Sequence, residues 1–552
     1  MKRACLQQNT NTYEQNHASS IRPLKINFVR MKKNGILLVL AGILFQVYSC
    51  APARKELPRS TPEEEGISSE AILQFVNAVE NSRNELLSFM LLRHGKVIAE
   101  GWSSPYQPEL KHTLYSTSKS FTSTAVGFAV HEKRISLSDK VISFFPEFVP
   151  DSVSSWLKEL TIENLLTMSV GQDPEPTAAI IGKDSNWVKA FLSTPITIQP
   201  GTRFLYNSLA TYIAGAIVQK VTGQTLIAYL TPRLFDPLGI EGADWETDPL
   251  GYNTGGWGLR LITEDMAKFG LLYLQKGKWN GKQILPARWV EEATKAHIMQ
   301  YPETPQAQKD SSDWLQGYGY QFWRCRHNAF RADGAYGQFI IMMPEQDAVL
   351  AITAETPDMQ DEINLVWKYL LPAFQPQKLP GNPSALKRLE EKLASLALPV
   401  PGKKALPETA NAISSSRYQL EPNERNLEEV TFRFADTICY FIVKFGGKEY
   451  EFPLGNGYWQ YGETSKPGPN LLLGALGHFA GLPPARIAGA FSWIDAKTLE
   501  VIVRYIESPH REIYQFVLDG NALRGNFQFS NMFGQVKWEL KGQVIQAEKN
   551  PK

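Results

Sequence analysis

Ser116-Thr117-Ser118-Lys119 places a hydroxyl and an amine one helical turn apart, where an apolar helical pattern begins that runs to about Glu132. A serine hydroxyl becomes a good nucleophile only when a neighbouring base takes its proton. On a helix, a lysine three residues further along lies on the same face and can be that base. This stretch therefore predicts nucleophilic catalysis by Ser116, with Lys119 as its partner.

The same Ser-x-x-Lys pattern occurs twice more, at Ser155/Lys158 and at Ser384/Lys387. We interpret the first of these as a surface segment. The second opens a charged helix, in which serine is a natural N-cap and lysine is solvated. The helix after Ser116 is apolar enough to be buried, and burial lowers the pKa of a lysine, as a base requires.

The composition indicates a globular protein with more than one domain: 552 residues, 43% hydrophobic, 20% charged, formal net charge +1. A nucleic-acid partner is not expected, because that would require a basic excess on one face. The histidines lack the H-E-x-x-H spacing of zinc enzymes. The four cysteines form neither a C-x-x-C pair nor a disulfide framework. For Cys325 and Cys439 the default expectation is buried free thiols, and a disulfide between them is the unsupported alternative.

Residues 1–50 are interpreted as a leader that ends in a lipoprotein-type signal peptide. Met31 and two lysines precede an apolar run over 36–47, and the following Ser49-Cys50 resembles the end of a bacterial lipobox. In such signals the cysteine is lipidated and becomes the mature amino terminus. We therefore expect translation to start at Met31, and Cys50 to anchor the protein to a bacterial membrane on its extracytoplasmic, periplasmic side. A plain secretory signal or an uncleaved anchor are the alternatives.

Four further segments follow the leader. Residues 51–66 are a polar, proline-containing tether, and residues 67–375 have strand patterns near both ends with helical patterns between them. This order predicts an α/β (α+β) domain with a mainly antiparallel sheet and a helical insertion. Within the insertion, Thr263 is expected to cap a helix that has Glu264 and Asp265 in its first turn. Residues 376–410 are a proline-rich linker with one short helix, and residues 411–552 carry short β-rich runs that predict a second, all-β domain of unknown role.

Two other segments can supply catalytic groups. Tyr206 lies between a Pro-Gly-Thr turn and a helix over 208–222, so its hydroxyl could relay the proton of the serine. The alternative is a core tyrosine, with Ser208 as a helix N-cap. Small residues around Gly334 precede a strand and let a backbone approach a substrate. Acyl transfer needs two N–H donors aimed at the developing oxyanion, and this strand could supply one. The alternative is a glycine-rich turn into an edge strand.

These motifs together resemble the class C β-lactamase-related serine hydrolases, the penicillin-binding-protein-like group, and in particular its 6-aminohexanoate-dimer-hydrolase-like subgroup. The resemblance covers residues 57–375 and rests on segments in the order of that family: 114–122, 200–208, 255–258 and 334–338. It implies a β-lactamase/transpeptidase-like fold, in which helices flank the sheet.

The resemblance also implies a role for each matching residue. Ser116 would be acylated, Lys119 would be its base, and Tyr206 would protonate the leaving group. The amides of Ser116 and Ala335 would form the oxyanion hole. The substrate would be bound by residues of the neighbouring segments: Ser208, Trp257, Asp333, Gly334 and Tyr336. For Trp257, a packed loop residue is an equal alternative.

Two departures from the family pattern bear on the substrate. Ser208 stands where the family often has asparagine, and Ala332-Asp333-Gly334 replaces the Lys-Thr-Gly of β-lactamases. The cation that would hold a β-lactam carboxylate is missing and an acid replaces it. This favours an esterase or amidase for a neutral or cationic acyl substrate.

We therefore expect a serine hydrolase that acts through an acyl-enzyme on a small ester or amide, without metal or organic cofactor. Three alternatives stay open. One is a D-alanyl-D-alanine carboxypeptidase or β-lactamase, and another is an inactive penicillin-binding-like receptor lipoprotein. The third is an envelope adaptor that works through its β domain. The oligomeric state is not predicted.

Overall fold

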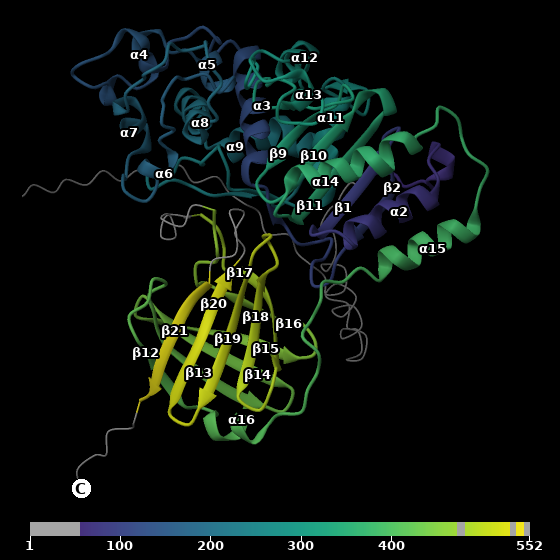
Figure 1. Ribbon diagram of the computed structural model, residues 1–552. Helices are drawn as coiled ribbons and strands as arrows, with labels where there is room; N and C mark the ends of the chain where they lie inside the picture. Colours follow the sequence, from purple (N-terminus) through teal and green to yellow (C-terminus); the bar gives the residue numbers. More distant parts are fainter. Residues whose placement is uncertain (1–55, 472–480, 530–536, 546–552) are drawn as a thin grey trace, which may run out of the picture. The chain divides into compact units, whose positions relative to one another are not determined.

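The computed structural model describes residues 56–471, 481–529 and 537–545 (Figure 1). The leader, its signal peptide and Cys50 lie outside these residues, so the interpretation of that segment stays a prediction. Among the helices that the structure describes, none is both long and apolar enough to cross a membrane.

A six-stranded antiparallel sheet forms the centre of the first domain, with the strand order β2-β1-β11-β10-β9-β8 (Figure 1). It combines strands from both ends of this region, as predicted. The strands are β1 (Glu85–Arg93), β2 (Lys96–Trp102), β8 (Trp323–Arg324), β9 (Phe330–Gly334), β10 (Gln338–Met343) and β11 (Ala348–Glu355).

Helices cover both faces of this sheet. Along β1, Phe89 and Leu91 pack into one core with helix α2, whereas Met90 and Leu92 pack into the other with helix α11. A strand that is buried on both faces needs a continuous apolar run, which this segment of β1 has. The covering helices are α2 (Ser69–Glu80), α14 (Met359–Leu365) and α15 (Pro383–Ala394) on the first face and α11 (Thr263–Leu274) on the second.

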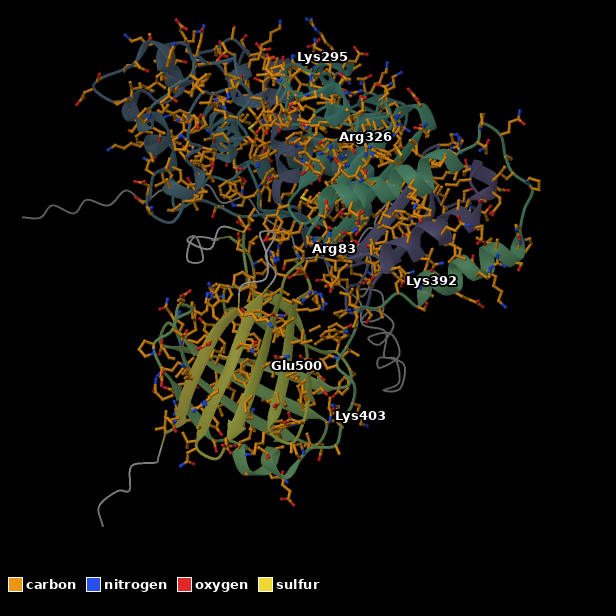
Figure 2. The ribbon with its side chains drawn as sticks, viewed as in Figure 1. Arg83, Lys295, Arg326, Lys392, Lys403 and Glu500 are labelled. Atoms are coloured by element: carbon orange, nitrogen blue, oxygen red, sulfur yellow. The ribbon has the colours of Figure 1, made fainter. Side chains whose placement is uncertain are left out.

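Helix α15 belongs to the predicted linker, but its apolar face is buried in the first domain. Leu389 joins the core around α2, and the charged face pairs Lys392 with Glu80 of α2 (Figure 2). The segment that follows the sheet therefore covers it before the chain enters the second domain.

The segment between β2 and β8 is the predicted helical insertion. It contains α3 (Ser118–His131), α4 (Ser155–Glu159), α5 (Ile162–Leu166), α6 (Thr177–Ile180), α7 (Trp187–Ser193), α8 (Ser208–Thr222), α9 (Leu226–Leu230), α10 (Asp236–Leu238), α12 (Ala287–Thr294) and α13 (Gln306–Lys309), as well as α11. It also holds a small sheet of β3 (His112–Thr113), β4 (Asp244–Trp245) and β5 (Leu259–Leu261).

Two helix caps differ from the sequence interpretation. The side chain of Asn207, not Ser208, caps α8 by accepting a hydrogen bond from the amide of Ala210. The prediction that Thr263 caps α11 is wrong, because Ile262 holds the cap position and the Thr263 hydroxyl instead hydrogen-bonds Ser88 of the sheet at 2.7 Å. The hydrogen bond of Thr263 to the sheet thus replaces the capping bond that its hydroxyl could have made within its own helix.

The second domain is all-β, as predicted. Its ten strands form one sheet that closes on itself through a parallel pairing of β15 with β17. The strands are β12 (Arg417–Leu420), β13 (Leu427–Ala435), β14 (Ile438–Phe445), β15 (Lys448–Asn456), β16 (Gln460–Thr464), β17 (Ala485–Trp493), β18 (Thr498–Tyr505), β19 (Arg511–Asp519), β20 (Ala522–Phe529) and β21 (Lys537–Val544). Alternate residues of β19 face an aromatic core, which is the period of a half-buried strand.

Candidate active site

Ser116 and Lys119 face each other at the start of helix α3. A 3₁₀ turn over Tyr115–Thr117 leads into the helix, so the two side chains are one turn apart on the same face. The Nζ of Lys119 lies 2.9 Å from the Oγ of Ser116. This distance permits direct proton transfer from the hydroxyl to a neutral amine.

Lys119 is a buried lysine whose other contacts are polar but uncharged. Its side chain is 2% exposed, and its Nζ lies 3.1 Å from the Oγ of Ser208 and 2.6 Å from the carbonyl oxygen of Gly256. Burial lowers the pKa of Lys119 to about 7, against the opposing effect of the carboxyl groups of Glu175 and Asp333. A substantial fraction of this amine is therefore neutral near pH 7 and can accept the proton of Ser116.

Tyr206 completes the cluster from the position before Asn207, the N-cap of helix α8. Its ring stacks on Trp323 with the centroids 5.8 Å apart, and the Nζ of Lys119 lies 5.0 Å from the ring centre. Burial raises the pKa of Tyr206, and a hydrogen bond with Ser116 opposes this rise. The capped helix start positions this tyrosine, because Asn207 bonds both the α8 backbone and the side chain of Gln172.

The turn between β9 and β10 lies against the Ser116 turn. The hydroxyl of Thr117 donates to the carbonyl oxygen of Gln338 at 2.7 Å, and the Gln338 side chain donates to the carbonyl oxygen of Ala335 at 3.0 Å. A Cβ at Gly334 would be only 2.2 Å from the carbonyl oxygen of Leu114. The backbones that carry the amides of Ser116 and Ala335 are thus packed together, as an oxyanion hole requires.

Four of the residues singled out in the sequence form one cluster: Ser116, Lys119, Tyr206 and Ser208. Ser208 contacts the lysine through its hydroxyl. Trp257 is different, since it is 6% exposed and packs in the hydrophobic core, 5.7 Å from the ring of Trp187. This favours a packed residue over a substrate platform, although the same loop supplies the carbonyl of Gly256 to Lys119.

Asp333 and Tyr336 are also occupied by protein contacts. The carboxylate of Asp333 accepts a hydrogen bond from the buried Arg331 at 2.8 Å, so its charge has a partner. The expectation that this acid attracts a cationic substrate therefore loses its electrostatic basis. Tyr336 is buried against the rings of Tyr115 and His510.

Two residues near this cluster were missed in the sequence. Glu175 acts electrostatically on Lys119, and burial raises the pKa of its own carboxyl. His510, from the second domain, contacts Tyr115 next to the nucleophile. Neither belongs to a motif, and only their position in the folded chain marks them.

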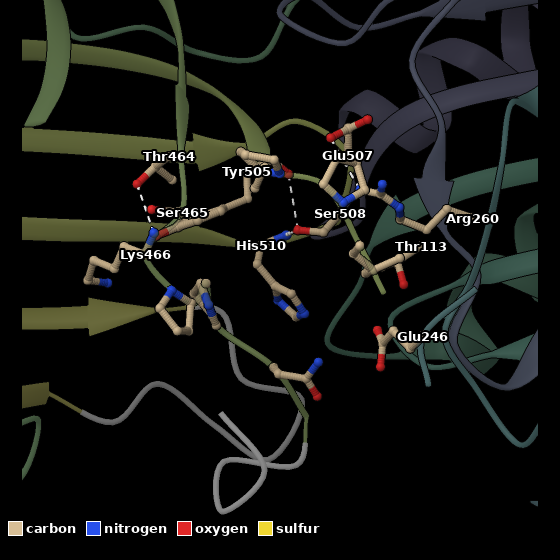
Figure 3. A pocket seen from close by; sticks show the side chains of 18 of the residues that line it. Thr113, Glu246, Arg260, Thr464, Ser465, Lys466, Tyr505, Glu507, Ser508 and His510 are labelled. Carbon is tan, nitrogen blue, oxygen red and sulfur yellow. Dashed lines mark hydrogen bonds and ion pairs between the residues drawn. The ribbon is translucent and has the colours of Figure 1, made fainter. Parts of the chain in front are cut away.

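A cavity of about 540 Å³ lies beside Tyr115, between the two domains (Figure 3). Glu246, Arg260, Lys466, Glu507 and His510 are among its lining residues, whereas Ser116 is not. Burial raises the pKa of Glu246 to about 8. In the described part of the chain, no group of three or more His, Cys, Asp or Glu side chains is arranged to hold a metal ion. Cys325 and Cys439 are buried and unpaired, as expected.

Comparisons with known proteins show the family of this chain. The family model described as Beta-lactamase matches residues 76–370, which is more than half of the chain, and the chain therefore belongs to this family. It is an enzyme of the β-lactamase-related serine hydrolases, as the motifs predict.

Among its relatives, the 6-aminohexanoate-dimer hydrolase of Paenarthrobacter ureafaciens is 24% identical over 323 residues, or 54% of this chain and 80% of that protein. A β-lactamase of Escherichia coli (strain K12) is 26% identical over 157 residues, which cover 28% of this chain and only 41% of that protein. The octameric penicillin-binding protein homologue from Pyrococcus abyssi is similar over 85% of this chain and 99% of its own, at 16% identity and a TM-score of 0.44.

Proposed function

We propose that this protein hydrolyses a small ester or amide through an acyl-enzyme formed on Ser116. The observation that carries the proposal is the 2.9 Å contact between the Ser116 hydroxyl and the amine of Lys119, whose pKa burial lowers to about 7. A buried lysine whose other contacts are neutral has a structure suited to a base, since an ion pair would keep it charged.

The reaction follows from the positions of these groups. Neutral Lys119 takes the hydroxyl proton while the Ser116 Oγ attacks the carbonyl carbon, and the amides of Ser116 and Ala335 stabilise the oxyanion. Tyr206 protonates the leaving alcohol or amine as the tetrahedral intermediate collapses, and recovers a proton from Lys119. Water then attacks the acyl-enzyme with the same groups in reverse order, which releases the acid and restores the serine.

The charges around the site favour an uncharged acyl group. Ala332 stands where β-lactamases carry the lysine that would hold a β-lactam carboxylate, and Arg331 balances the charge of the neighbouring Asp333. The relative from Paenarthrobacter is named a 6-aminohexanoate-dimer hydrolase, which supports a linear amide but does not bear on the charge of the acyl group. We therefore place a neutral linear amide or ester ahead of a β-lactam or a D-alanyl-D-alanine peptide. The alternative to an enzyme of this kind is an inactive penicillin-binding-like receptor.

An active-site probe separates enzyme from receptor. A fluorophosphonate should label the wild-type protein, and Ser116→Ala should abolish the labelling, because the probe reacts with activated serines. Ser155→Ala is the matched control, since it alters a surface copy of the same motif. Absence of wild-type labelling, or labelling that survives Ser116→Ala, would rule out the proposal. A panel of p-nitrophenyl esters, short amide oligomers, D-amino-acid peptides and nitrocefin would then rank the substrates.

We further propose that Cys50 is lipidated and holds the enzyme on the extracytoplasmic side of a bacterial membrane. The support is the sequence pattern alone: a basic start, an apolar run and a cysteine. Mass spectrometry of the membrane-extracted protein tests this proposal. An unmodified Cys50 in the mature protein would exclude it.

A further inference from the structure

One loop of the β domain packs against the first domain, beside the 3₁₀ turn over Tyr115–Thr117 that carries Ser116 (the catalytic turn). It joins β18 to β19, and Figure 3 shows several of its side chains near Thr113 and Arg260. The amide of Thr113 donates to the carbonyl oxygen of Glu507 at 2.9 Å, and Arg260 donates to the Glu507 carboxylate at 3.2 Å. The hydroxyl of Tyr106 donates to the carbonyl oxygen of Ser508 at 2.8 Å. The loop is therefore held by backbone and side-chain bonds.

The last residue of this loop, His510, touches both sides of the candidate oxyanion hole. It is 1% exposed, and its Nε2 is hydrogen-bonded to the hydroxyl of Tyr115. Its ring also packs edge-on to Tyr336, with the centroids 4.8 Å apart and an interplanar angle of 90°. Burial raises the pKa of Tyr115 and lowers that of His510, so both groups are neutral. In the tautomer of His510 that carries its proton on Nδ1, the Tyr115 hydroxyl donates the hydrogen bond to Nε2.

Both tyrosines have a backbone conformation that a side chain normally disfavours. The φ angles are 46° for Tyr115 and 67° for Tyr336, in the left-handed region that favours glycine. Such residues persist where their surroundings hold them. Tyr115 directly precedes Ser116, and Tyr336 directly follows Ala335, so these two conformations direct the peptide groups next to the two proposed oxyanion donors.

We propose that His510 of the β domain is a positioning residue of the hydrolase, which holds Tyr115 and Tyr336 so that the amides of Ser116 and Ala335 converge on the oxyanion. This inference rests on the proposed function. It makes the second domain a structural part of the active site, in contrast to an adaptor attached to an independent enzyme.

The test compares His510→Ala and His510→Gln in the full chain, with fluorophosphonate labelling rates and ester kcat and KM as readouts. Loss of one oxyanion donor typically costs ~100-fold in rate, so His510→Ala should lower labelling and kcat by about 10- to 100-fold, with KM within about threefold. His510→Gln should recover most of the loss, because its amide oxygen can accept the Tyr115 hydroxyl. Tyr115→Phe should lower the rate as well. The double variant Tyr115→Phe/His510→Ala should be little slower than Tyr115→Phe alone, because both changes remove the same hydrogen bond.

Tyr106→Phe is the matched control, because it removes another buried tyrosine hydroxyl that bonds the same loop. It should leave kcat within about twofold. A folded His510→Ala protein with the wild-type labelling rate would overturn the inference, as would equal losses in His510→Ala and His510→Gln. If His510→Ala does not fold, the Tyr115→Phe variant tests the inference instead. A wild-type labelling rate in Tyr115→Phe would overturn the inference. A wild-type protein that no probe labels would instead refute the proposed function itself.

Discussion

At the scale of single residues, the proposed role of Lys119 as a base depends on which groups contact its amine. Its amine contacts two hydroxyls and one carbonyl, and the carboxyl groups of Glu175 and Asp333 act on it without an ion pair. Lys268 provides a contrast, since this equally buried lysine contacts Asp265 at 3.3 Å. Burial without an ion pair distinguishes a lysine suited to act as a base from a structural one.

The pKa of Lys119 predicts how the reaction depends on pH. The base is the neutral amine, so kcat/KM for an ester should rise from pH 6 to pH 8 with an inflection near 7. Lys119→Arg should abolish acylation at every pH in this range, because the guanidinium stays protonated. Stopped-flow acylation rates measure both effects. Lys158→Arg in the surface copy is the control, and full activity in Lys119→Arg would contradict the assigned role.

At the scale of elements, the turn from β9 to β10 must approach the catalytic turn closely. Gly334 makes this possible, since a Cβ there would be 2.2 Å from the carbonyl oxygen of Leu114 and 3.0 Å from the Thr117 hydroxyl. Atoms at such distances from an added Cβ have to move, and moving backbone atoms costs more energy than moving the end of a flexible side chain.

Gly334→Ala should therefore push the Ala335 amide away from Ser116. We expect a loss of about 1–3 kcal/mol in the free energy of unfolding from overpacking, with a fall in kcat of at least tenfold. Denaturant unfolding and steady-state kinetics measure the two effects. Gly381→Ala, at a glycine with open space around it, should change neither. Wild-type kcat in Gly334→Ala would show that this contact does not position the site.

At the scale of the whole described molecule, ion pairs connect residues of the first domain with residues of the β domain. Glu85 at the start of β1 accepts hydrogen bonds from Arg504 and Arg511 of the β domain, and Arg511 also contacts Glu355 at 3.1 Å. Arg504 is almost fully buried. Removal of one partner from such a cluster leaves a buried charge without compensation, which costs more than the pair contributes.

Glu85→Gln should thus destabilise the folded chain by about 3 kcal/mol, which thermal unfolding at neutral pH would detect as a lower Tm. Glu451→Gln breaks an exposed pair with Arg433 within the β domain and should cost less than about 1 kcal/mol. Equal Tm values for the two variants would mean that the interdomain pairs contribute no more than an exposed pair.

Much of the architecture could be predicted from local pattern. The hairpin of β1 and β2, the helix after Ser116 and the strands of the β domain all follow from apolar periodicity and turn residues, which act over a few neighbouring positions. The prediction of a cap at Thr263 failed, because a distant hydroxyl on Ser88 competes for that side chain. Such competition is invisible in a sequence window.

By itself, the sequence determined which residues we propose for the chemistry: one helical turn places Ser116 and Lys119 together, and motif order adds Tyr206. Only the tertiary structure decided their electrostatic state and their surroundings. Burial lowers the pKa of Lys119, Arg331 neutralises Asp333, and His510 reaches the catalytic turn from almost 400 residues along the chain. Hydrogen bonding, charge and desolvation act through space, so groups far apart in sequence determine them together.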